Sequence, residues 1–543
     1  RRRQDQEVMA REAEQRAIRR AQRQNASFST ANAKGLQCNM NDINTNKLNV
    51  TLRYFGQPVV ECYFCGAMGW DEENKGSNAQ PHFGKQCCMQ GKYGNKHTSF
   101  RNPSGNRNIH LPEVPPYLRG LLTGEDRLSK YFRKHIRSIN AGMTLGSVKM
   151  NDKSERHGAP STFKISGQLM RFFGSLLKPT SEPKASCAQI YFYDPRDQVE
   201  IRLNRLNGAT RRNKQFDTTL FNNLLTMLTT FNALVRQFKT VHEYIIDNNL
   251  NAEELRIQLH ESKLLPSEPG NHRWAYHIPS VDEMALVMPN SMPRDAERSI
   301  VCAVRAPNTL QSLITFPHTH GKWDPCGYPL LFPYGTSTWH QHYKTSHRHE
   351  HDLTTQVVVD LSLNKFFRHM TRWRNEDDPD MDYFNHLHRC GRLWQQYIVD
   401  TWARVEMNRL IWNRINQATL RADLYKGVQD SMNKGDGEDS GVAIILPATY
   451  FGSQRWYHNK FQNAMALCRE FGKPTFFLTF TLDINCAEVQ EQLRGEGSNA
   501  YDRPELLCRV FRMKRNAILK EIKEGLFGPL IAHSAVIEFQ KRG

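Results

Sequence analysis

Four cysteines near the N-terminal end of the chain have a spacing that suits a metal site. Cys62 and Cys65 form a C-x-x-C pair, and Cys87 and Cys88 follow after a loop. A C-x-x-C turn lets two thiolates share one metal ion, and a second pair completes the tetrahedron that zinc prefers. The second pair is awkward because its cysteines are adjacent, so one member could be replaced by His82, His97 or Cys38.

Four buried free thiols are the alternative interpretation of this block. Residues 52–97 lack a long apolar pattern, so a hydrophobic core alone would hold them together poorly. A bound metal ion supplies folding free energy to a segment of this kind. The sequence therefore predicts a small unit stapled by structural Zn²⁺.

The C-terminal stretch, residues 528–543, has the alternation of a β-strand. One face carries Ser534, Val536, Glu538 and Gln540. We expect this strand to be the first arm of a hairpin whose second arm lies outside the sequence, because the chain stops at the turn glycine. Together with a first residue that is Arg rather than Met, this pattern predicts a chain truncated at both ends.

The composition favours a nucleic-acid partner. The 543 residues include 73 Lys and Arg against 55 Asp and Glu, a formal net charge of +18, and the pI is about 9.4. Such an excess attracts polyanions. The 12 scattered cysteines suit a reducing compartment. No apolar run approaches the ~18–20 residues of a membrane span, and the N-terminal residues lack the apolar core of a signal peptide.

Two short runs interleave cations with aromatic rings, as a platform for single-stranded nucleic acid would. They are Arg455-Trp456-Tyr457 and Arg372-Trp373-Arg374. Bases stack on aromatic side chains while the cations hold the phosphate backbone. Tryptophans that simply fill a core are the alternative.

Two histidine-rich runs are weaker candidates for chemistry. His318-Thr319-His320 lies between Pro317 and Gly321 in a predicted loop and has a polar central residue, so we interpret it as an imitation of a metal motif. The second run has five histidines among basic residues, and we interpret it as a solvated surface: His340, His342, His347, His349 and His351.

The elements that position these residues indicate a multi-domain α+β protein. We expect a basic, partly disordered arm at 1–45, the zinc unit at 46–110, a mixed α/β region at 111–265, a loop-rich connection at 266–345, and a larger unit at 346–543. Helical periodicity is expected at 128–139, 217–238, 353–371 and 393–429. The last hundred residues run strand, helix, strand, helix, strand: 442–446, 459–471, 474–482, 503–525 and 528–543.

Several long motifs resemble one family, the Helitron transposases, which are the Rep/helicase proteins of eukaryotic rolling-circle transposons. They include YPLLFPYG, GRLWQQYIVDTWARVEMNRL, NQATLRADLYKG, AIILPATYFGSQRW and FQNAMALCREFGKPTFFLTFT. RPELLCRVFRMK and VIEFQKRG follow, and TFKISGQLMRFFGSLL, AQIYFYDP and the cysteine block match upstream. The resemblance covers roughly residues 55–543, with the motifs in the family's order.

The resemblance implies that residues 346–543 hold the Helitron helicase-like N-terminal domain and the opening part of an HUH-type nuclease sheet. In such nucleases a tyrosine attacks a DNA phosphodiester while paired histidines hold Mg²⁺ or Mn²⁺. Both histidines and tyrosines are expected beyond residue 543, so no catalytic residue is assigned in this chain. Glu538, ahead of Gln540, is the candidate third metal ligand, and a water-facing polar pair is the alternative.

Further DNA contacts follow from the same resemblance. Thr479 and Thr481 share a face of the strand expected at 474–482, where hydroxyls could meet a phosphate, although β-branched residues also simply fill sheets. Lys541 and Arg542 extend the basic surface at the chain end. One departure weakens the match: Leu482-Asp483-Ile484-Asn485-Cys486 stands where the family has a Cys-Asn-Pro-Lys-Trp-like run.

The sequence thus predicts the N-terminal fragment of a Helitron transposase, located in the nucleus, whose partners are single-stranded DNA and transposon ends. No G-x-x-x-x-G-K-[ST] motif occurs, so ATP binding is not expected in this segment. The alternative is a non-enzymatic zinc and nucleic-acid-binding module, as a domesticated or decayed transposon copy would be.

Overall fold

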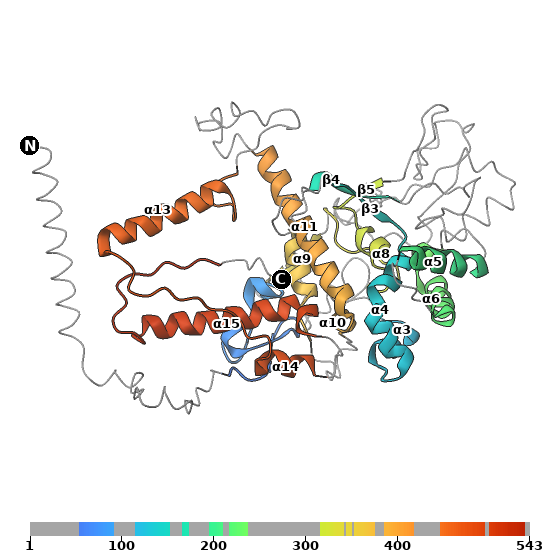
Figure 1. Ribbon diagram of the computed structural model, residues 1–543, viewed down its shortest axis with the longest axis horizontal. Coiled ribbons are helices and arrows are strands. Elements are labelled where there is room, and N and C mark those ends of the chain that lie inside the picture. The colour runs from blue at the N-terminus through green and yellow to red at the C-terminus, as the bar shows by residue number, and fades with distance from the viewer. Residues whose placement is uncertain are drawn as a thin grey trace, which may run out of the picture. The chain divides into compact units, whose positions relative to one another are not determined.

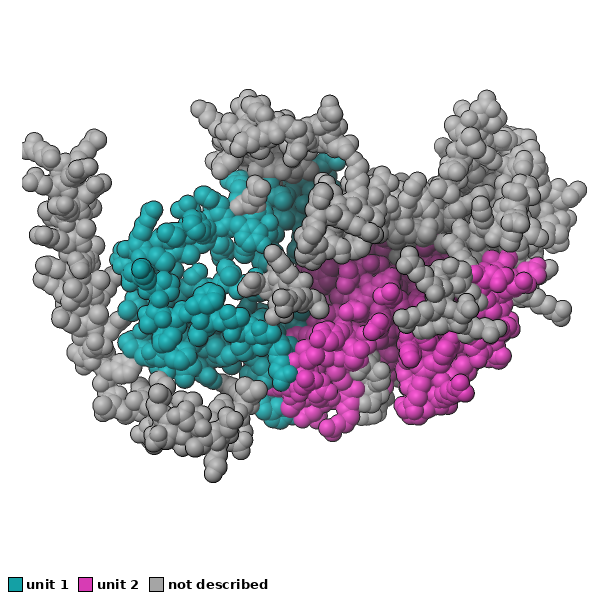
Figure 2. All heavy atoms as spheres, in the orientation of Figure 1, with its two compact units in different colours: residues 1–55, 406–483, 508–543 teal, residues 56–405, 484–507 magenta. Residues whose placement is uncertain are grey.

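The computed structural model forms two compact units. Unit 1 comprises Arg1–Phe55, Glu406–Asp483 and Cys508–Gly543, and unit 2 comprises Gly56–Val405 and Ile484–Leu507; Figure 2 colours them teal and magenta. The structure describes residues 54–91, 114–152, 165–172, 195–209, 217–236, 315–341, 344–349, 352–374, 385–416, 446–494 and 499–537. The predicted basic arm at 1–45 lies outside these residues.

Unit 2 begins with a short antiparallel hairpin, β1 (Val60–Glu61) and β2 (Met68–Gly69). Its turn carries Cys62 and Cys65. Two 3-10 turns follow, η2 (Asp71–Glu73) and η3 (Gly84–Gln86), and Cys87 comes directly after the second. The small cysteine unit expected from the sequence is therefore built from turns, with few residues in regular structure.

Two helices come next along the chain, α3 (Pro116–Thr123) and α4 (Arg127–Met143) (Figure 1). Asp126 caps α4 by accepting hydrogen bonds from the amides of Leu128 and Ser129, a contact that stabilises a helix by about 1 kcal/mol. The inward residues Phe132, Ile136 and Ile139 are 0–1% exposed. The predicted helical periodicity at 128–139 is confirmed.

A three-stranded antiparallel sheet joins segments far apart in the sequence. Its order is β3 (Ser147–Asp152), β4 (Ile165–Phe172) and β5 (Thr315–Pro317), with Met170 opposite Pro317. Helices α5 (Pro195–Ala209) and α6 (Thr218–Phe231) lie between β4 and β5 in the chain. Asp217 caps α6, whose apolar face is buried as expected: Leu220, Leu224, Met227 and Leu228.

The core of unit 2 contains a loop rather than a regular element. Residues 318–339, with the short helix α8 (Trp323–Gly327), are almost continuously buried. Buried backbone groups need hydrogen-bond partners, and side chains from other elements supply them. Asn140 Nδ2 donates to the Gly327 carbonyl at 3.0 Å, and Arg404 donates to the His318 carbonyl at 2.8 and 3.0 Å. The expected loop around His318-Thr319-His320 is present, but both histidines are buried within it.

In the rest of unit 2, one segment predicted to be a helix is partly a strand. Two strands, β6 (Lys344–His349) and β7 (Asp352–Asp360), pair antiparallel. We expected a helix from 353, but the β-branched run Thr354-Thr355 and Val357-Val358-Val359 favours a strand once a partner is available. Helices α9 (Leu363–Met370), α10 (His386–Arg389) and α11 (Gly391–Ile415) follow, and α14 (Ala487–Leu493) and η8 (Ala500–Asp502) belong to the same unit.

Unit 1 contains the end of α11 and two long helices, α13 (Gln454–Phe471) and α15 (Pro504–Lys523), the latter from residue 508 onward. Both helices agree with the sequence prediction. The strands predicted at 474–482 and at 528–543 are not formed among the described residues: 474–482 and 529–537 have no strand assignment, and Figure 1 draws them as loops. Residues 442–445 and 538–543 lie outside the described part.

A strand is stable only beside a neighbour that satisfies its amides and carbonyls and covers one face. Among the described residues, no strand pairs with 474–482 or 529–537. Phe477 is 94% exposed and Val536 is 69% exposed, although Phe480 stacks on Phe511 of α15 at 5.6 Å between ring centroids. The described chain is thus mostly helical with small sheets, and the nuclease sheet expected at its C-terminal end is absent from the described residues. Nor does any helix there combine the length and apolar character needed to cross a bilayer.

Candidate metal centre

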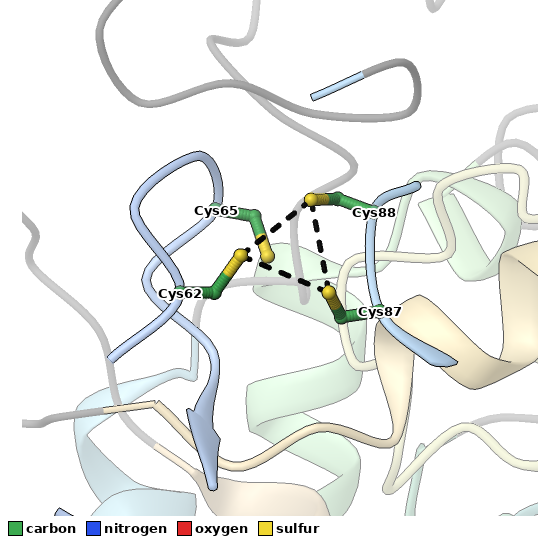
Figure 3. A group of neighbouring side chains, drawn as sticks. All are labelled: Cys62, Cys65, Cys87 and Cys88. Atoms are coloured by element: carbon green, nitrogen blue, oxygen red, sulfur yellow. Dashed lines mark hydrogen bonds between the residues drawn. The ribbon is translucent and has the colours of Figure 1, made fainter. Parts of the chain in front are cut away.

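The four predicted cysteines meet in one buried cluster. Their Sγ atoms all lie within 4.8 Å of one another, and the side chains are 0–3% exposed. Figure 3 shows Cys62 and Cys65 on one loop and Cys87 and Cys88 on the segment facing it. The distances from Cys62 Sγ to Cys87 Sγ and Cys88 Sγ are both 3.7 Å, and the Cys87–Cys88 distance is 3.8 Å.

The three distances among Cys62, Cys87 and Cys88 fit a tetrahedral metal ion, and Cys65 Sγ lies within 4.8 Å of the other three sulfurs. With Zn–S bonds of about 2.3 Å, two thiolates at adjacent corners of a tetrahedron lie about 3.8 Å apart. A disulfide would bring two sulfurs to about 2.05 Å, and all four cysteines are free. The cluster can therefore hold a metal ion such as zinc with four sulfur ligands.

Local backbone geometry aims the four thiols at one point. Gly66, at φ +69°, closes the first turn, with its amide donating to the Cys62 carbonyl at 2.9 Å. After the second pair, Met89, Gln90 and Gly91 all have positive φ, at 54°, 58° and 79°. A left-handed conformation costs about 1–2 kcal/mol for a residue with a side chain. A strained turn of this kind persists where the surrounding structure holds it, and a metal ion on Cys88 would do so.

The thiols of the cluster differ in the direction in which their pKa is shifted. The pKa of Cys87 is held far below its usual range by hydrogen bonds from Cys62, Cys65 and Cys88, and the positive charge of Arg372 acts in the same direction. The pKa of Cys88 is raised because its hydrogen bonds to the other three thiols and its burial favour the protonated form. A bound metal ion would take the place of these shared protons, with the four cysteines as thiolate ligands.

The alternative ligands do not join the cluster in the described part of the chain. His82 has both ring nitrogens in other contacts: Nδ1 accepts from the Gly84 amide at 3.2 Å, and Nε2 lies 3.1 Å from Gln90 Nε2. His97 and Cys38 lie outside the described residues. The adjacent pair Cys87-Cys88, which seemed awkward from the sequence, supplies two sulfurs itself.

The two arginines of the run Arg372-Trp373-Arg374 lie inside the protein, not on the exposed nucleic-acid platform that the composition of the run predicted. Arg372 and Arg374 are each 5% exposed. Arg374 Nε donates to the Cys65 carbonyl at 3.1 Å, and Arg372 Nε donates to the Gln86 carbonyl at 3.1 Å. The stacking-platform interpretation is wrong here, because both guanidinium groups are engaged inside the protein. The two arginines are 286 and 309 residues away from Gln86 and Cys65, so no local sequence signal indicates these contacts.

Residues 367–543 match a family model described as "Helitron helicase-like domain at N-terminus". The chain carries a Helitron helicase-like N-terminal region. A search of curated proteins found no match. The Helitron-like region includes the end of α9, α10, α11, α13, α14 and α15, and also Arg372 and Arg374. The contacts just described therefore connect this region with the cysteine cluster inside unit 2.

The second cation–aromatic run opens α13 in unit 1. Ser453 caps this helix by accepting from the Trp456 amide at 3.0 Å. The Trp456 ring lies 4.7 Å from Phe451 and 5.0 Å from Tyr457, and Lys460 Nζ lies 5.6 Å above it. Tyr457 is 56% exposed. The structure thus gathers an accessible aromatic cluster with a cation beside it, and neighbouring Arg455 is half-buried.

The other residues predicted to contact DNA or a metal ion lie on a loop or outside the described residues. Thr479 and Thr481 are exposed on the loop at 474–482, so they do not share a strand face as expected. The proposed metal ligands Glu538 and Gln540, with Lys541 and Arg542, lie outside the described residues. Their roles stay predictions.

Proposed function

We propose that the chain is the N-terminal part of a Helitron rolling-circle transposase that binds single-stranded DNA and the ends of the transposon, in the nucleus. The match of residues 367–543 to the Helitron helicase-like N-terminal domain carries this proposal. In the complete enzyme this region would contribute to a metal-dependent tyrosine nuclease. Glu538 and Gln540 are its proposed ligands for Mg²⁺ or Mn²⁺.

The charge of unit 1 supports a polyanionic partner. Its described residues contain twelve Lys and Arg and five Asp and Glu. Phosphate contacts from such cations supply affinity that falls as salt releases the condensed counterions. The cluster Phe451-Trp456-Tyr457 adds exposed rings on which bases can stack, a contact of about 1–3 kcal/mol per base.

We propose structural zinc for the cysteine cluster. Four buried thiols within 4.8 Å of one another, and the strained turn at Met89-Gln90 after the second pair, support this choice. Zinc there has no open coordination position, so its role is to hold the fold rather than to activate water.

A direct test measures binding of the purified chain to a fluorescent oligo-thymidine at 50 and 200 mM salt. Binding should weaken steeply between the two salt concentrations. Trp456→Ala should weaken it by about tenfold, because one base loses its stacking partner. Tyr501→Ala removes another exposed aromatic, outside α13, and should leave binding unchanged. Equal binding by the Trp456 variant would contradict the assignment.

The same sample tests the nuclease assignment. Incubated with single-stranded DNA and Mn²⁺, residues 1–543 should neither nick the DNA nor form a covalent adduct, because the tyrosine nucleophile is proposed to lie outside them. Cleavage would show that this chain holds a complete nuclease site.

A further inference from the structure

The cysteine unit, residues 56–91, differs in charge from the rest of the protein. It contains four acidic residues, Glu61, Asp71, Glu72 and Glu73, and two basic ones, Lys75 and Lys85. Zn²⁺ with four thiolates adds a further net charge of about −2. Asp71 and Glu72 are exposed. A surface of this sign repels phosphate, so the unit is poorly suited to contact nucleic acid.

Its contacts are instead with the start of the Helitron-like region. The Met68 amide donates to the Trp373 carbonyl at 2.8 Å, and Ala67 forms an antiparallel bridge with Arg374. Residues 373–374 therefore extend the β1–β2 hairpin by one more backbone pairing. Because β1 and β2 have two residues each, this added pairing is a large part of the hairpin's hydrogen bonding.

Arg374 then links the metal turn to two helices. Its Nε donates to the carbonyl of the ligand Cys65 at 3.1 Å. Its NH2 donates to the His369 carbonyl at 3.2 Å, at the end of α9. Its amide donates to Asn385 Oδ1 at 3.2 Å, and Asn385 Nδ2 donates back to its carbonyl at 2.8 Å, directly before α10.

Arg372 makes the matching contacts on the side of the second cysteine pair. Its Nε and NH2 bind the carbonyl and the side-chain oxygen of Gln86, at 3.1 and 3.0 Å. NH1 pairs with Glu73 at 3.4 Å, and the guanidinium lies 5.1 Å above the Phe83 ring. A buried cation beside Cys87 offsets the negative charge of a tetrathiolate metal centre.

We propose that the metal centre is an internal staple for the Helitron-like region, with Arg372 and Arg374 as the positioning residues that connect metal binding to the order of residues 366–374 and 385–390. This inference rests on the proposed zinc site. It assigns that site to folding and not to contact with nucleic acid. Because binding and folding are linked, residues that hold the metal turn in place must also raise the affinity for the metal.

The experiment uses the full chain, its metal content and hydrogen exchange. Removing the metal with a chelator should speed exchange of the Arg374 amide and of α10 by at least about tenfold, while α6 in the same unit keeps its protection. Arg374→Met should weaken zinc binding, measured against a competing chelator, by about 10–100-fold, as loss of a group orienting a ligand does. Arg137→Met, at an exposed position of α4, should leave the affinity unchanged.

Four outcomes separate the inference from the proposed zinc site. Loss of the metal with unchanged exchange at 366–374 and 385–390 would overturn the staple and leave the zinc site standing. Wild-type zinc affinity in Arg374→Met would also overturn it. A chain purified without metal, and unable to bind added Zn²⁺, overturns both. Faster exchange together with weaker binding supports the staple.

Discussion

The core of unit 2 and the loops at 474–482 and 529–537 in unit 1 differ in which side chains they bury. In unit 2, polar and charged groups are buried with partners: Arg404, 1% exposed, pairs with Asp324 at 2.5 Å. In unit 1, large apolar groups such as Phe477 and Val536 are exposed. A segment with little regular structure can thus be well packed when its backbone groups are hydrogen-bonded. Residues that favour strands stay exposed when no neighbouring strand covers them.

The charges of the two regions differ as well. The described part of unit 1 is basic, whereas residues 56–91 of unit 2 are acidic. A net charge of +18 over the whole chain conceals this difference. The proposed DNA-binding surface and the proposed metal site therefore belong to separate units, and we expect that each can be disrupted without the other.

The largest expected effect comes from the metal centre. Cys62→Ser should abolish zinc binding and lower the melting temperature of unit 2 by roughly 10 °C, because several kcal/mol of metal-linked stability is lost. Calorimetry with metal analysis measures both. Cys508→Ser, at an exposed cysteine of unit 1, is the control and should behave as wild type. An unchanged melting temperature for Cys62→Ser would mean that the cluster does not hold a structural metal.

A second comparison sets a buried ion pair against an exposed one. Arg404→Met leaves Asp324 charged and buried and removes the donors to the His318 carbonyl, so it should cost about 3–5 kcal/mol. Arg409→Met removes a pair with Glu406 in which both side chains are about half exposed, and it should cost less than about 1 kcal/mol. Urea unfolding followed by tryptophan fluorescence provides both values. Equal losses of stability in the two variants would contradict the burial of the Arg404–Asp324 pair.

A pH effect is expected from Lys322 in the core of unit 2. Burial lowers the pKa of Lys322 to about 8, whereas an unfolded lysine titrates near 10.4. Between these values the unfolded state binds more protons, so this group makes folding more favourable as pH rises; below pH 8 the full burial cost is present.

Lys322→Met should remove this dependence. The stability of wild type relative to the variant should rise by roughly 1 kcal/mol per pH unit between pH 8 and 10. Lys520→Met, on the exposed face of α15, should show no such trend. A difference between wild type and Lys322→Met that stays flat with pH would show that Lys322 titrates normally.

The smallest effect is expected at the exposed face of unit 1. Phe477→Ser should change the free energy of unfolding by less than about 0.5 kcal/mol and should reduce aggregation, measured by light scattering. Phe332→Ala, in the core of unit 2 at 1% exposure, should cost about 3–5 kcal/mol. A cost above 2 kcal/mol for Phe477→Ser would mean that residues 474–482 are packed as a strand in solution.

The predictions that succeeded depended on local rules. Spacing identified the four cysteines, and the recurrence of Phe132, Ile136 and Ile139 identified α4. The predictions that failed needed knowledge of neighbours. Residues 352–360 became a strand because β6 lies beside them, and 474–482 did not because nothing among the described residues pairs with them. Composition alone made Arg372-Trp373-Arg374 look like Arg455-Trp456-Tyr457, although both arginines of the first run are buried and the second run borders an exposed surface.

By itself, the sequence identified the four cysteines that cluster, most helices and the family resemblance, because each depends on residue type at short or fixed spacing. Tertiary structure decided which cations are engaged inside the protein and which lie at its surface. It also decided that Arg374, 309 residues from Cys65, holds the metal turn. Such long-range contacts arise only when the chain folds, since no local pattern specifies which distant carbonyl a guanidinium will bind.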